Sequence, residues 1–460
     1  MLFSSLFFAI TGKAYAQSFQ GLQHDKNVIS EVFNNPALAQ TDDAYQVNIG
    51  GISILADNNA YAVVKSDLFN GATPQGGKNY FKLPGDFPRA IWINADMLGP
   101  SVAFKVKKKY SFAITTRARY MMNVDNFSNS LFQLIDNKVS DTGYIYKINN
   151  LSFTTQLFAE VNFIYSGYLY QSEDFNVSAG LGFKVLTGIA AVGIGMPNGQ
   201  FRLDADNTPH DFKGSSVNVA FTPYANTWLS NGQPTSALSN ATANRGYGLD
   251  LGVVYNYTPQ TGVHVNHDGY VFRLAVSITD IGSINYSASS TTGSYKSKSD
   301  TFNYNNINKD PIRTYGQSIE QFLTDSVITQ TGAKTKFKMG LPTALRINAD
   351  AKVGDNGHFK SYLNFNLLLN LRKPSADNFS THYVSTCNIT PRFLWKSYGV
   401  GVPFSFNANK QGFLGVVLYA GPFYIGSSSI ANFLILKNMN AVDGFLGFSF
   451  RLPGKKQELF

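Results

Sequence analysis

Charged and amide side chains recur at every second position in one stretch of the chain, and they are the residues best placed to do chemistry. Residues 345–352 read LRINADAK, with Arg346, Asn348, Asp350 and Lys352 at alternate positions. If this stretch is a strand, the four side chains share one face, because successive side chains point to opposite sides. Three of them are ionisable, so they must meet water or one another. Such a row can bias the passage of a solute, or it can form ion pairs that stiffen a wall.

Signals for catalysis or metal binding are weak. His264 and His267 lie three residues apart before Asp268 in a predicted turn, but no further ligand cluster accompanies them. Residues 203–207 (LDADN) resemble the first half of a calcium-binding loop, but the central glycine and the distant glutamate of such a loop are missing. No G-x-S-x-G, Walker or dinucleotide-binding motif occurs. We therefore expect no catalytic residue, no metal and no cofactor, and an enzyme ranks behind the two functions considered below.

The elements that must position the polar residues are two-faced strands. Residues 359–372 (FKSYLNFNLLLNLR) alternate with a period of two, with an oily face opposite a face of charges and amides. The same pattern returns in residues 109–120, 175–185, 247–257 and 270–279. An oily face this continuous, and this often repeated, is typical of strands that face lipid on one side and a polar lumen on the other.

Composition supports the same architecture over the whole chain. Of its 460 residues only 15% are charged, whereas about a quarter is usual in soluble proteins. Mean hydropathy is nevertheless near neutral, at −0.11, which is too low for a bundle of membrane helices. We predict an all-β fold, a transmembrane antiparallel β-barrel of roughly 14 strands with an even strand number. Its predicted lumen-lining residues are Arg117, Arg119, Arg273, Arg346, Asp350, Lys360, Asn364, Asn366, Asn370 and Arg372.

The start of the chain resembles a secretory signal peptide. An apolar run at residues 2–10 is followed by Ala14-Tyr15-Ala16, an A-x-A cleavage site, although a short N-terminal anchor is the alternative. We therefore expect a signal peptide at 1–16, a plug-like segment at 17–43, a barrel at 44–453 and a tail at 454–460. The expected location is the outer membrane of a Gram-negative bacterium. Cys387 is the single cysteine, so no intrachain disulfide can form.

Two long connections have apolar residues at helical spacing. Residues 126–139 and 314–329 are each predicted to form a loop helix. Such helices could cap a barrel mouth, enter the lumen or pack against loops. The prediction is therefore a barrel with one or two loop helices.

The last candidate strand, residues 445–452 (FLGFSFRL), places Phe448 and Phe450 on its outward face. A C-terminal strand of this type resembles the signal read by outer-membrane assembly machinery, which we expect as a partner. Outer-membrane lipid and lipopolysaccharide are expected around the wall. The net charge of +9 is spread over candidate loops and ends without a single basic stripe, so nucleic acid is not an expected partner.

A resemblance to known families comes from the N-terminal run at residues 32–38 (VFNNPAL). It resembles the segment that packs into or beneath barrels of the long-chain fatty-acid transporter (FadL) type and of the type IX secretion PorV and PorP/SprF types. Residues 247–257, 277–286 and 341–352 look like a closer relative, a family of uncharacterised exported barrels. The resemblance implies a barrel, and its members span transporters and secretion-linked parts.

The same run supplies the predicted plug residues, Asn34, Asn35, Pro36 and Ala37. Pro36 fixes its own backbone angle and pushes Asn35 toward extended geometry. The two asparagines could then bond groups of the barrel wall and pin the segment. An ordinary Asn-Pro turn is the alternative.

Two functions remain open at this point. The first is an outer-membrane channel or transporter for a small-molecule solute, which could be hydrophobic. The second is a structural or secretion-linked barrel that anchors a periplasmic or surface protein partner.

Overall fold

The structure is a computed structural model. It describes residues 28–40, 45–64, 80–83, 88–106, 109–129, 145–203, 209–210, 215–223, 243–259, 270–297, 328–408, 411–434 and 438–452. The predicted signal peptide, the calcium-loop echo at 204–207, the pair His264 and His267, most of the two predicted loop helices and the tail after 453 lie outside these residues.

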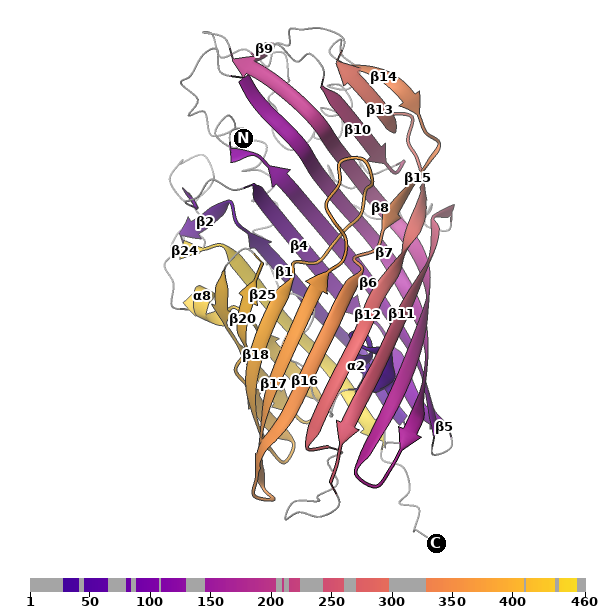
Figure 1. The fold of residues 1–460 in the computed structure, drawn as a ribbon, viewed down its shortest axis with the longest axis vertical. Helices are drawn as coiled ribbons and strands as arrows, with labels where there is room; N and C mark the ends of the chain where they lie inside the picture. Colours follow the sequence, from indigo (N-terminus) through magenta and orange to yellow (C-terminus); the bar gives the residue numbers. More distant parts are fainter. Residues whose placement is uncertain are drawn as a thin grey trace.

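Strands make up almost all of the described chain (Figure 1). The strands of the main sheet are β1 (Tyr45–Asn58), β4 (Arg89–Leu98), β5 (Ser101–Val106), β6 (Tyr110–Phe127), β7 (Ile145–Gln171), β8 (Phe175–Leu203), β9 (Pro209–His210), β10 (Ser216–Phe221), β11 (Arg245–Tyr257), β12 (Phe272–Ser287), β13 (Gly293–Ser297), β14 (Ile328–Ala333), β15 (Lys336–Gly340), β16 (Ala344–Asp355), β17 (Phe359–Asn370), β18 (Thr386–Trp395), β19 (Tyr398–Gly401), β20 (Phe404–Asn407), β21 (Gly412–Leu414), β22 (Val416–Ala420), β23 (Phe423–Ser427) and β25 (Ala441–Leu452). A small second sheet holds β2 (Tyr61–Val64), β3 (Tyr80–Lys82) and β24 (Asn438–Met439). The helices are α2 (Val28–Val32), the 3₁₀ turn η1 (Pro36–Ala39) and α8 (Ile430–Leu434).

The main sheet closes into a ring, because the last strand, β25, pairs with the first, β1, along most of their length. The path runs from β1 through β4/β5, β6, β7, β8, β10/β11, β12/β13, β14–β16, β17, β18, β19/β20, β21/β22, β23 and β25. It passes about 14 positions, and every strand pairing along it is antiparallel. The predicted all-β transmembrane barrel of roughly 14 strands is confirmed.

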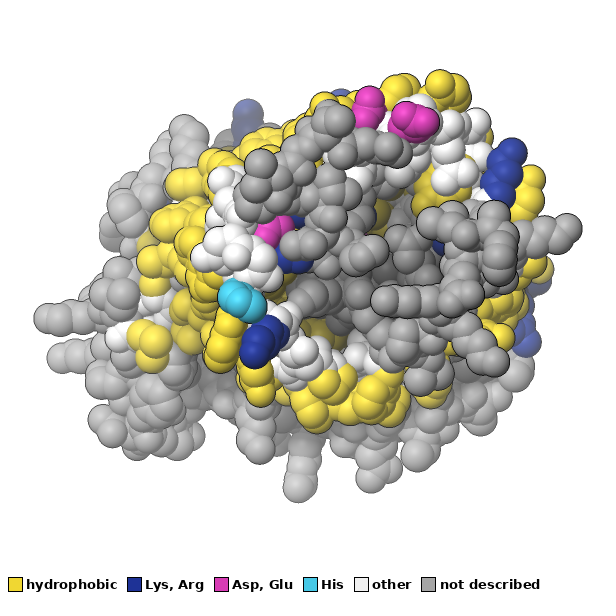
Figure 2. All heavy atoms as spheres, turned by 90° about the horizontal axis from the view of Figure 1, so that it is seen from below, with side chains coloured by type: hydrophobic (Ala, Val, Ile, Leu, Met, Phe, Trp, Pro, Cys, Tyr) yellow, Lys and Arg dark blue, Asp and Glu magenta, His cyan; other side chains and the backbone are white. Residues whose placement is uncertain are grey.

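The barrel wall has apolar side chains on its outer surface and polar side chains on its inner surface, which is the reverse of the distribution in a soluble protein. In β17 the outward Leu363 is 46% exposed, while the neighbouring inward Asn364 is 2% exposed. β6 follows the same rule, with Phe112 and Ile114 outside and Ser111 inside. Figure 2, which looks onto one end of the molecule, shows hydrophobic side chains gathered along the perimeter. An apolar exterior of this kind is what lipid requires, since apolar surface is stable against acyl chains and costly in water.

The two ends of the barrel differ. Tight turns join β7 to β8, β16 to β17, β18 to β19 and β22 to β23 at the short-turn end, which is the lower end in Figure 1. The opposite, long-loop end carries the extended connections, and there β7 and β8 rise above the wall formed by β16, β17 and β18. Short turns face the periplasm in bacterial barrels of the outer membrane.

Only the ends of the two predicted loop helices fall within the described residues, where Asn129 is helical and most of the other terminal residues belong to strands; the helices themselves stay a prediction. Asn126 and Phe127 belong to β6, and residues 328–329 belong to β14. In both places a neighbouring strand supplies backbone partners, since Phe127 pairs with Arg89 of β4 and Thr329 pairs with Lys296 of β13. At these end residues, sheet pairing over long sequence distances has outweighed the local helical pattern.

Candidate functional site

The chain segment at residues 28–40, here called the N-terminal segment, lies inside the ring of strands (Figure 1). It consists of α2, a tight turn and η1. Asn35 is extended, with φ −154° and ψ 116°, and its side-chain oxygen accepts a hydrogen bond from the Ala37 backbone N–H at 2.9 Å. Pro36 follows at the first position of η1, where its missing N–H is no loss. This local cap turns the chain so that its small residues face the wall.

Neutral hydrogen bonds hold the N-terminal segment to the wall. The Asn35 side-chain amide donates to the backbone carbonyls of Val253 in β11, at 3.2 Å, and Val276 in β12, at 3.1 Å. The Ser277 hydroxyl donates to the Asn34 carbonyl at 2.5 Å. The Ser166 hydroxyl of β7 donates to the Ala37 carbonyl at 3.1 Å. Three neighbouring parts of the wall therefore bind one short stretch of backbone and one asparagine side chain.

Two wall glycines make room for this contact. A Cβ at Gly180 in β8 would overlap the backbone of Pro36 and Ala37. A Cβ at Gly252 in β11 would overlap the Asn35 amide. The sequence contains 40 glycines, so neither could be singled out before the strands were placed beside the segment.

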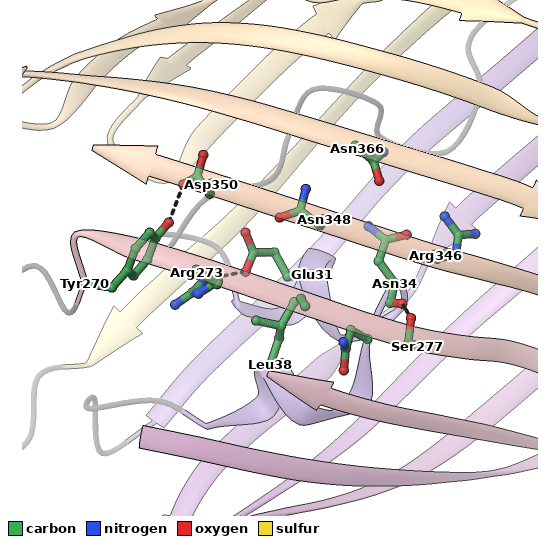
Figure 3. A pocket seen from close by; sticks show the side chains of 12 residues that line it. Glu31, Asn34, Leu38, Tyr270, Arg273, Ser277, Arg346, Asn348, Asp350 and Asn366 are labelled. Atoms are coloured by element: carbon green, nitrogen blue, oxygen red, sulfur yellow. Dashed lines mark hydrogen bonds and ion pairs between the residues drawn. The ribbon is translucent and has the colours of Figure 1, made fainter. Parts of the chain in front are cut away.

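A small polar cavity lies between the N-terminal segment and the wall (Figure 3). Its volume is about 20 Å³, enough for an ion or a water molecule. Its lining residues are Glu31, Asn34, Asn35, Leu38, Tyr270, Arg273, Ala275, Ser277, Arg346, Asn348, Asp350 and Asn366. Arg273 lies 3.5 Å from Glu31, and the Tyr270 hydroxyl donates to Asp350 at 2.5 Å. Four of the predicted lumen residues, Arg273, Arg346, Asp350 and Asn366, thus meet around one space.

A buried layer of ion pairs, here called the ion-pair layer, crosses six neighbouring strands. It consists of Asp96, Arg117, Arg119, Glu160, Lys184, Asp250 and Asp280. Arg117 lies 2.7 Å from Glu160, and Arg119 lies 3.0 Å from both Asp96 and Asp280. Each of these side chains is almost inaccessible to solvent, so the pairs are desolvated. The layer fills this part of the lumen with three basic and four acidic side chains.

Lys184 and Asp280 join the two halves of this layer. The Lys184 ammonium lies 2.9 Å from Asp250 and 2.5 Å from Asp280. Asp280 has a left-handed backbone, with φ 59°, where the pairing of β11 and β12 shifts by a residue, and its N–H donates to Asp250 at 2.7 Å. A bulge of this kind re-aims a side chain. Here it turns Asp280 toward Arg119 and Lys184.

Sequence reasoning named the arginines of the layer but missed their acidic partners. The alternation in residues 175–185 and 247–257 puts Lys184 and Asp250 on polar strand faces, whereas Asp96, Glu160 and Asp280 are not among the residues named from the sequence. For Asp96, Glu160 and Asp250 the signal is their position in the alternation, which points each of them inward; Asp280 stands on the outward positions of β12 and is turned inward only by the bulge. Which inward charges meet, however, depends on strand register, and the register is a long-range property.

The connection between β17 and β18, residues 371–385, is here called the inward loop because it reaches across the ring to β7 and β8. The Asn150 amide donates to the Pro374 carbonyl at 3.2 Å, and the Ser152 hydroxyl donates to the Ser375 carbonyl at 3.2 Å. A Cβ at Gly195 in β8 would overlap the backbone of Ala376. The loop thus occupies the lumen above the ion-pair layer.

The tip of the inward loop is fixed by charged partners. Tyr383 accepts a hydrogen bond from Arg119 and donates one to Asp280 at 3.0 Å. The His382 ring nitrogen Nε2 lies 2.9 Å from the Asp125 carboxylate. Burial by itself would lower the pKa of His382, but the hydrogen bond and charge of Asp125 outweigh it and raise the pKa above its ordinary value of 6.5. The loop is therefore tied directly into the ion-pair layer.

A larger cavity opens at the long-loop end, between the inward loop and β10, β12, β13 and β15. Its volume is about 880 Å³, and we call it the vestibule. Its lining includes five cationic residues and two phenylalanines: Lys334, Lys336, Lys338, Arg372, Lys373, Phe337 and Phe379. One acidic residue, Asp377, also lines it.

Comparison with known proteins places the chain in a family. The sequence model of a family of unknown function, DUF5723, matches residues 36–428. The chain belongs to this family. The match confirms the predicted membership of an uncharacterised family. No curated protein matches.

Three solved structures illustrate what this DUF5723 barrel is similar to. The monoaromatic hydrocarbon channel TodX, as a deltaS2S3 mutant, has 9% sequence identity over 92% of this chain and 94% of its own, with a TM-score of 0.40. The toluene transporter TbuX of Ralstonia pickettii has 10% identity over 97% and 100%, with a TM-score of 0.36. A FadL homologue from Pseudomonas aeruginosa has 9% identity over 95% and 97%, with a TM-score of 0.30.

The remaining predicted lumen residues of the DUF5723 barrel lie apart from the ion-pair layer. Asn364 donates to Asp350 at 3.1 Å, beside the small polar cavity. Asn370 accepts from the Arg372 backbone N–H at 2.9 Å, and Arg372 donates to the carbonyls of Leu341 and Gly282 near the vestibule. Lys360 lies near the short-turn end, where it pairs in register with Asp355.

The predicted assembly signal lies on the outer face of β25. Phe448 packs against Phe423 of β23, with ring centroids 4.2 Å apart, and against Phe450 at 4.3 Å. Phe450 is exposed on the outside of the barrel. Both rings are thus available to lipid or to a protein that binds this strand.

Among the described residues of the DUF5723 barrel, no three His, Cys, Asp or Glu side chains gather closely enough to hold a metal ion. Within the same residues, no helix is long and apolar enough to cross a membrane.

Proposed function

We propose that this protein is an outer-membrane channel for a small solute and that its N-terminal segment acts as the gate. The observation that carries the proposal is the way the segment fills the lumen at residues 28–40. It is bound there by a few neutral hydrogen bonds, one ion pair and the packing of Val32 and Phe33, and it lies against wall glycines, so it can leave without unpairing any strand. Neutral hydrogen bonds contribute only about 1 kcal/mol each.

The vestibule supports solute entry from the long-loop end. At about 880 Å³ it lies in the size range of small-molecule sites. Its cationic residues and the rings of Phe337 and Phe379 suit a solute with an apolar part and a negative charge. The lumen-lining role of Arg117, Arg119 and Arg346 is then to hold the wall in shape and to set the polarity of the path.

The test is solute uptake into liposomes that contain the purified full-length protein. In Gly180→Ala the added methyl group overlaps the backbone of Ala37, so the N-terminal segment should be displaced and uptake should rise several-fold. Gly444→Ala is the matched control, because the nearest atom to its added Cβ, the Gly426 carbonyl oxygen, is 3.8 Å away. If neither wild type, Gly180→Ala nor a chain lacking residues 17–43 passes any solute class, the channel proposal fails.

A structural or secretion-linked barrel is the second candidate, and the ion-pair layer favours it. A lumen filled with paired, desolvated charges stiffens a wall and leaves little room for passage. Such a barrel would anchor a periplasmic or surface protein. Crosslinking in membranes followed by purification tests this function, and recovery of the lone chain would count against it.

A further inference from the structure

The seam where β25 closes onto β1 contains a second small cavity, at the long-loop end. Its volume is about 20 Å³, and oxygen-bearing side chains from β1, β25, β18 and β20 line it. The principal ones are Asp57, Asp443, Ser405, Asn407 and Thr386. A space of this size holds one ion or one water molecule.

The two carboxylates of this cavity differ in the number of hydrogen bonds that they accept. Asp443 accepts hydrogen bonds from the Ser427 hydroxyl at 2.8 Å, from the Ser428 N–H at 2.6 Å and hydroxyl at 2.7 Å, and from the Ser429 hydroxyl. Four donors of this kind stabilise the ionised carboxylate. Asp443 is therefore a negative charge held in place by the segment that precedes α8.

The Asp57 carboxylate has one oxygen atom that accepts no hydrogen bond. Its Oδ2 accepts from the Asn407 amide at 2.8 Å, but its Oδ1 has no hydrogen-bond partner, although Asp57 is 5% exposed. Ser405, which is 2% exposed, likewise has a hydroxyl oxygen without a partner. Both atoms belong to residues that line the same cavity. Buried polar atoms without partners are costly, so the structure calls for a group between them.

That group should carry positive charge. Within the described residues, neither Asp57 nor Asp443 forms an ion pair with a basic side chain, and no Lys, Arg or His lines the cavity. Two buried carboxylates without a counter-charge repel one another and are strongly disfavoured. Oxygen-only donors, with carboxylates, a hydroxyl and an amide, suit a hard cation of the Ca²⁺ type, which accepts irregular oxygen coordination.

We propose that Asp57, Asp443 and Ser405 form a Ca²⁺ site that clamps the closing seam of the barrel. The cation joins β1, the first strand of the ring, to β25, the last, and to β20 beside them. It also holds the segment at residues 427–429 through Asp443. Its effect is to stabilise closure of the ring, independently of whether the lumen conducts a solute.

Terbium luminescence offers a direct test, because Tb³⁺ replaces Ca²⁺ and is sensitised by a nearby indole. Trp92 of β4 pairs directly with Asp57 across the strands, whereas the exposed Trp395 lies at the short-turn end. Refolded full-length protein in detergent free of lipopolysaccharide should show sensitised Tb³⁺ luminescence that Ca²⁺ displaces. Trp92→Phe should lose the luminescence yet keep a Ca²⁺-dependent rise in the unfolding temperature.

Variants of the proposed ligand residues distinguish a bound cation from the alternative, a proton shared between the Asp57 and Asp443 carboxylates. Asp57→Asn should abolish the Ca²⁺-dependent rise in unfolding temperature, and Ser405→Ala should weaken Ca²⁺ binding several-fold without loss of the fold. Asp355→Asn, in a tight turn at the opposite end, is the matched control and should behave as wild type. The proposal is overturned if Ca²⁺ leaves the unfolding temperature of the wild type unchanged, or if Asp57→Asn retains the rise.

Discussion

The N-terminal segment and the inward loop both lie within the barrel, but different chemistry holds them there. Neutral groups make most hydrogen bonds to the N-terminal segment, chiefly the Asn35 amide and the Ser166 hydroxyl, beside one ion pair of Glu31 with Arg273. Ionised or ion-paired groups bind the tip of the inward loop, where Tyr383 meets Arg119 and Asp280, and His382 meets Asp125.

This difference separates a removable element from a permanent one. A neutral hydrogen bond exchanged with water costs little when it opens. Breaking a buried charged network leaves an uncompensated charge and costs several times more. The inward loop is therefore expected to move with the wall, whereas the N-terminal segment can undock from it.

The largest expected effect comes from removing Arg119, which serves both the ion-pair layer and the inward loop. Arg119→Met strips Asp96 of its closest partner, 3.0 Å away, and removes the donor to Tyr383. Breaking a buried pair in this way costs about 3–5 kcal/mol. The measurement is urea unfolding of the refolded barrel in detergent. A loss below about 1 kcal/mol would mean that the layer does not hold the wall and the loop together.

Next in size is the undocking of the N-terminal segment by Asn35→Ala, which removes the two bonds to Val253 and Val276. Docking of the segment should weaken by about 1–3 kcal/mol, while global unfolding of the barrel changes much less. Hydrogen exchange at residues 28–40 measures the docking. Asn34→Ala is the matched control, because Asn34 binds Ser277 through its backbone carbonyl. Equal effects of the two variants would contradict the role assigned to the Asn35 amide.

The inward loop should respond to pH through His382. Because Asp125 raises the pKa of His382 above 6.5, this contact stabilises the docked loop fully below pH 6.5 and is lost as the pH rises through the raised pKa. Hydrogen exchange of residues 371–385 should therefore quicken on going from acidic to mildly alkaline pH. His382→Gln should remove this dependence. Exchange that slows with rising pH, after correction for the intrinsic rate, would contradict the assignment.

The smallest effect is expected at the pair between Glu31 and Arg273. The charges lie 3.5 Å apart, and the Arg273 side chain is 15% exposed beside the small polar cavity. Glu31→Gln should change docking of the N-terminal segment by less than about 1 kcal/mol. A larger loss, measured by the same exchange experiment, would show that the segment is held by charge as the inward loop is, and the contrast between the two would disappear.

The alternation of residues along single strands was enough to predict much of this protein. The inward position of Arg117, Arg119, Asn364 and Asn366 follows from a period of two, which is local and needs no knowledge of the neighbouring strand. The barrel and its approximate strand number follow from how often that period returns. The ends of the predicted loop helices were misplaced, because the backbone partners of Phe127 and Thr329 come from distant strands.

By itself, the sequence determined which side chains face lipid and which face inward, since this depends only on the alternation and on the cost of burying polar groups in lipid. Only the tertiary structure decided which inward charges meet, because Arg119, Lys184 and Asp280 are joined by the register of separate strands and by one bulge. It also decided that Gly180 and Gly252, among 40 glycines, receive the N-terminal segment, and that Asp57 and Asp443 face one cavity at the seam. Contacts of this kind join residues on separate strands, 96 positions apart for Lys184 and Asp280, so they depend on strand pairing and, at the seam, on closure of the ring.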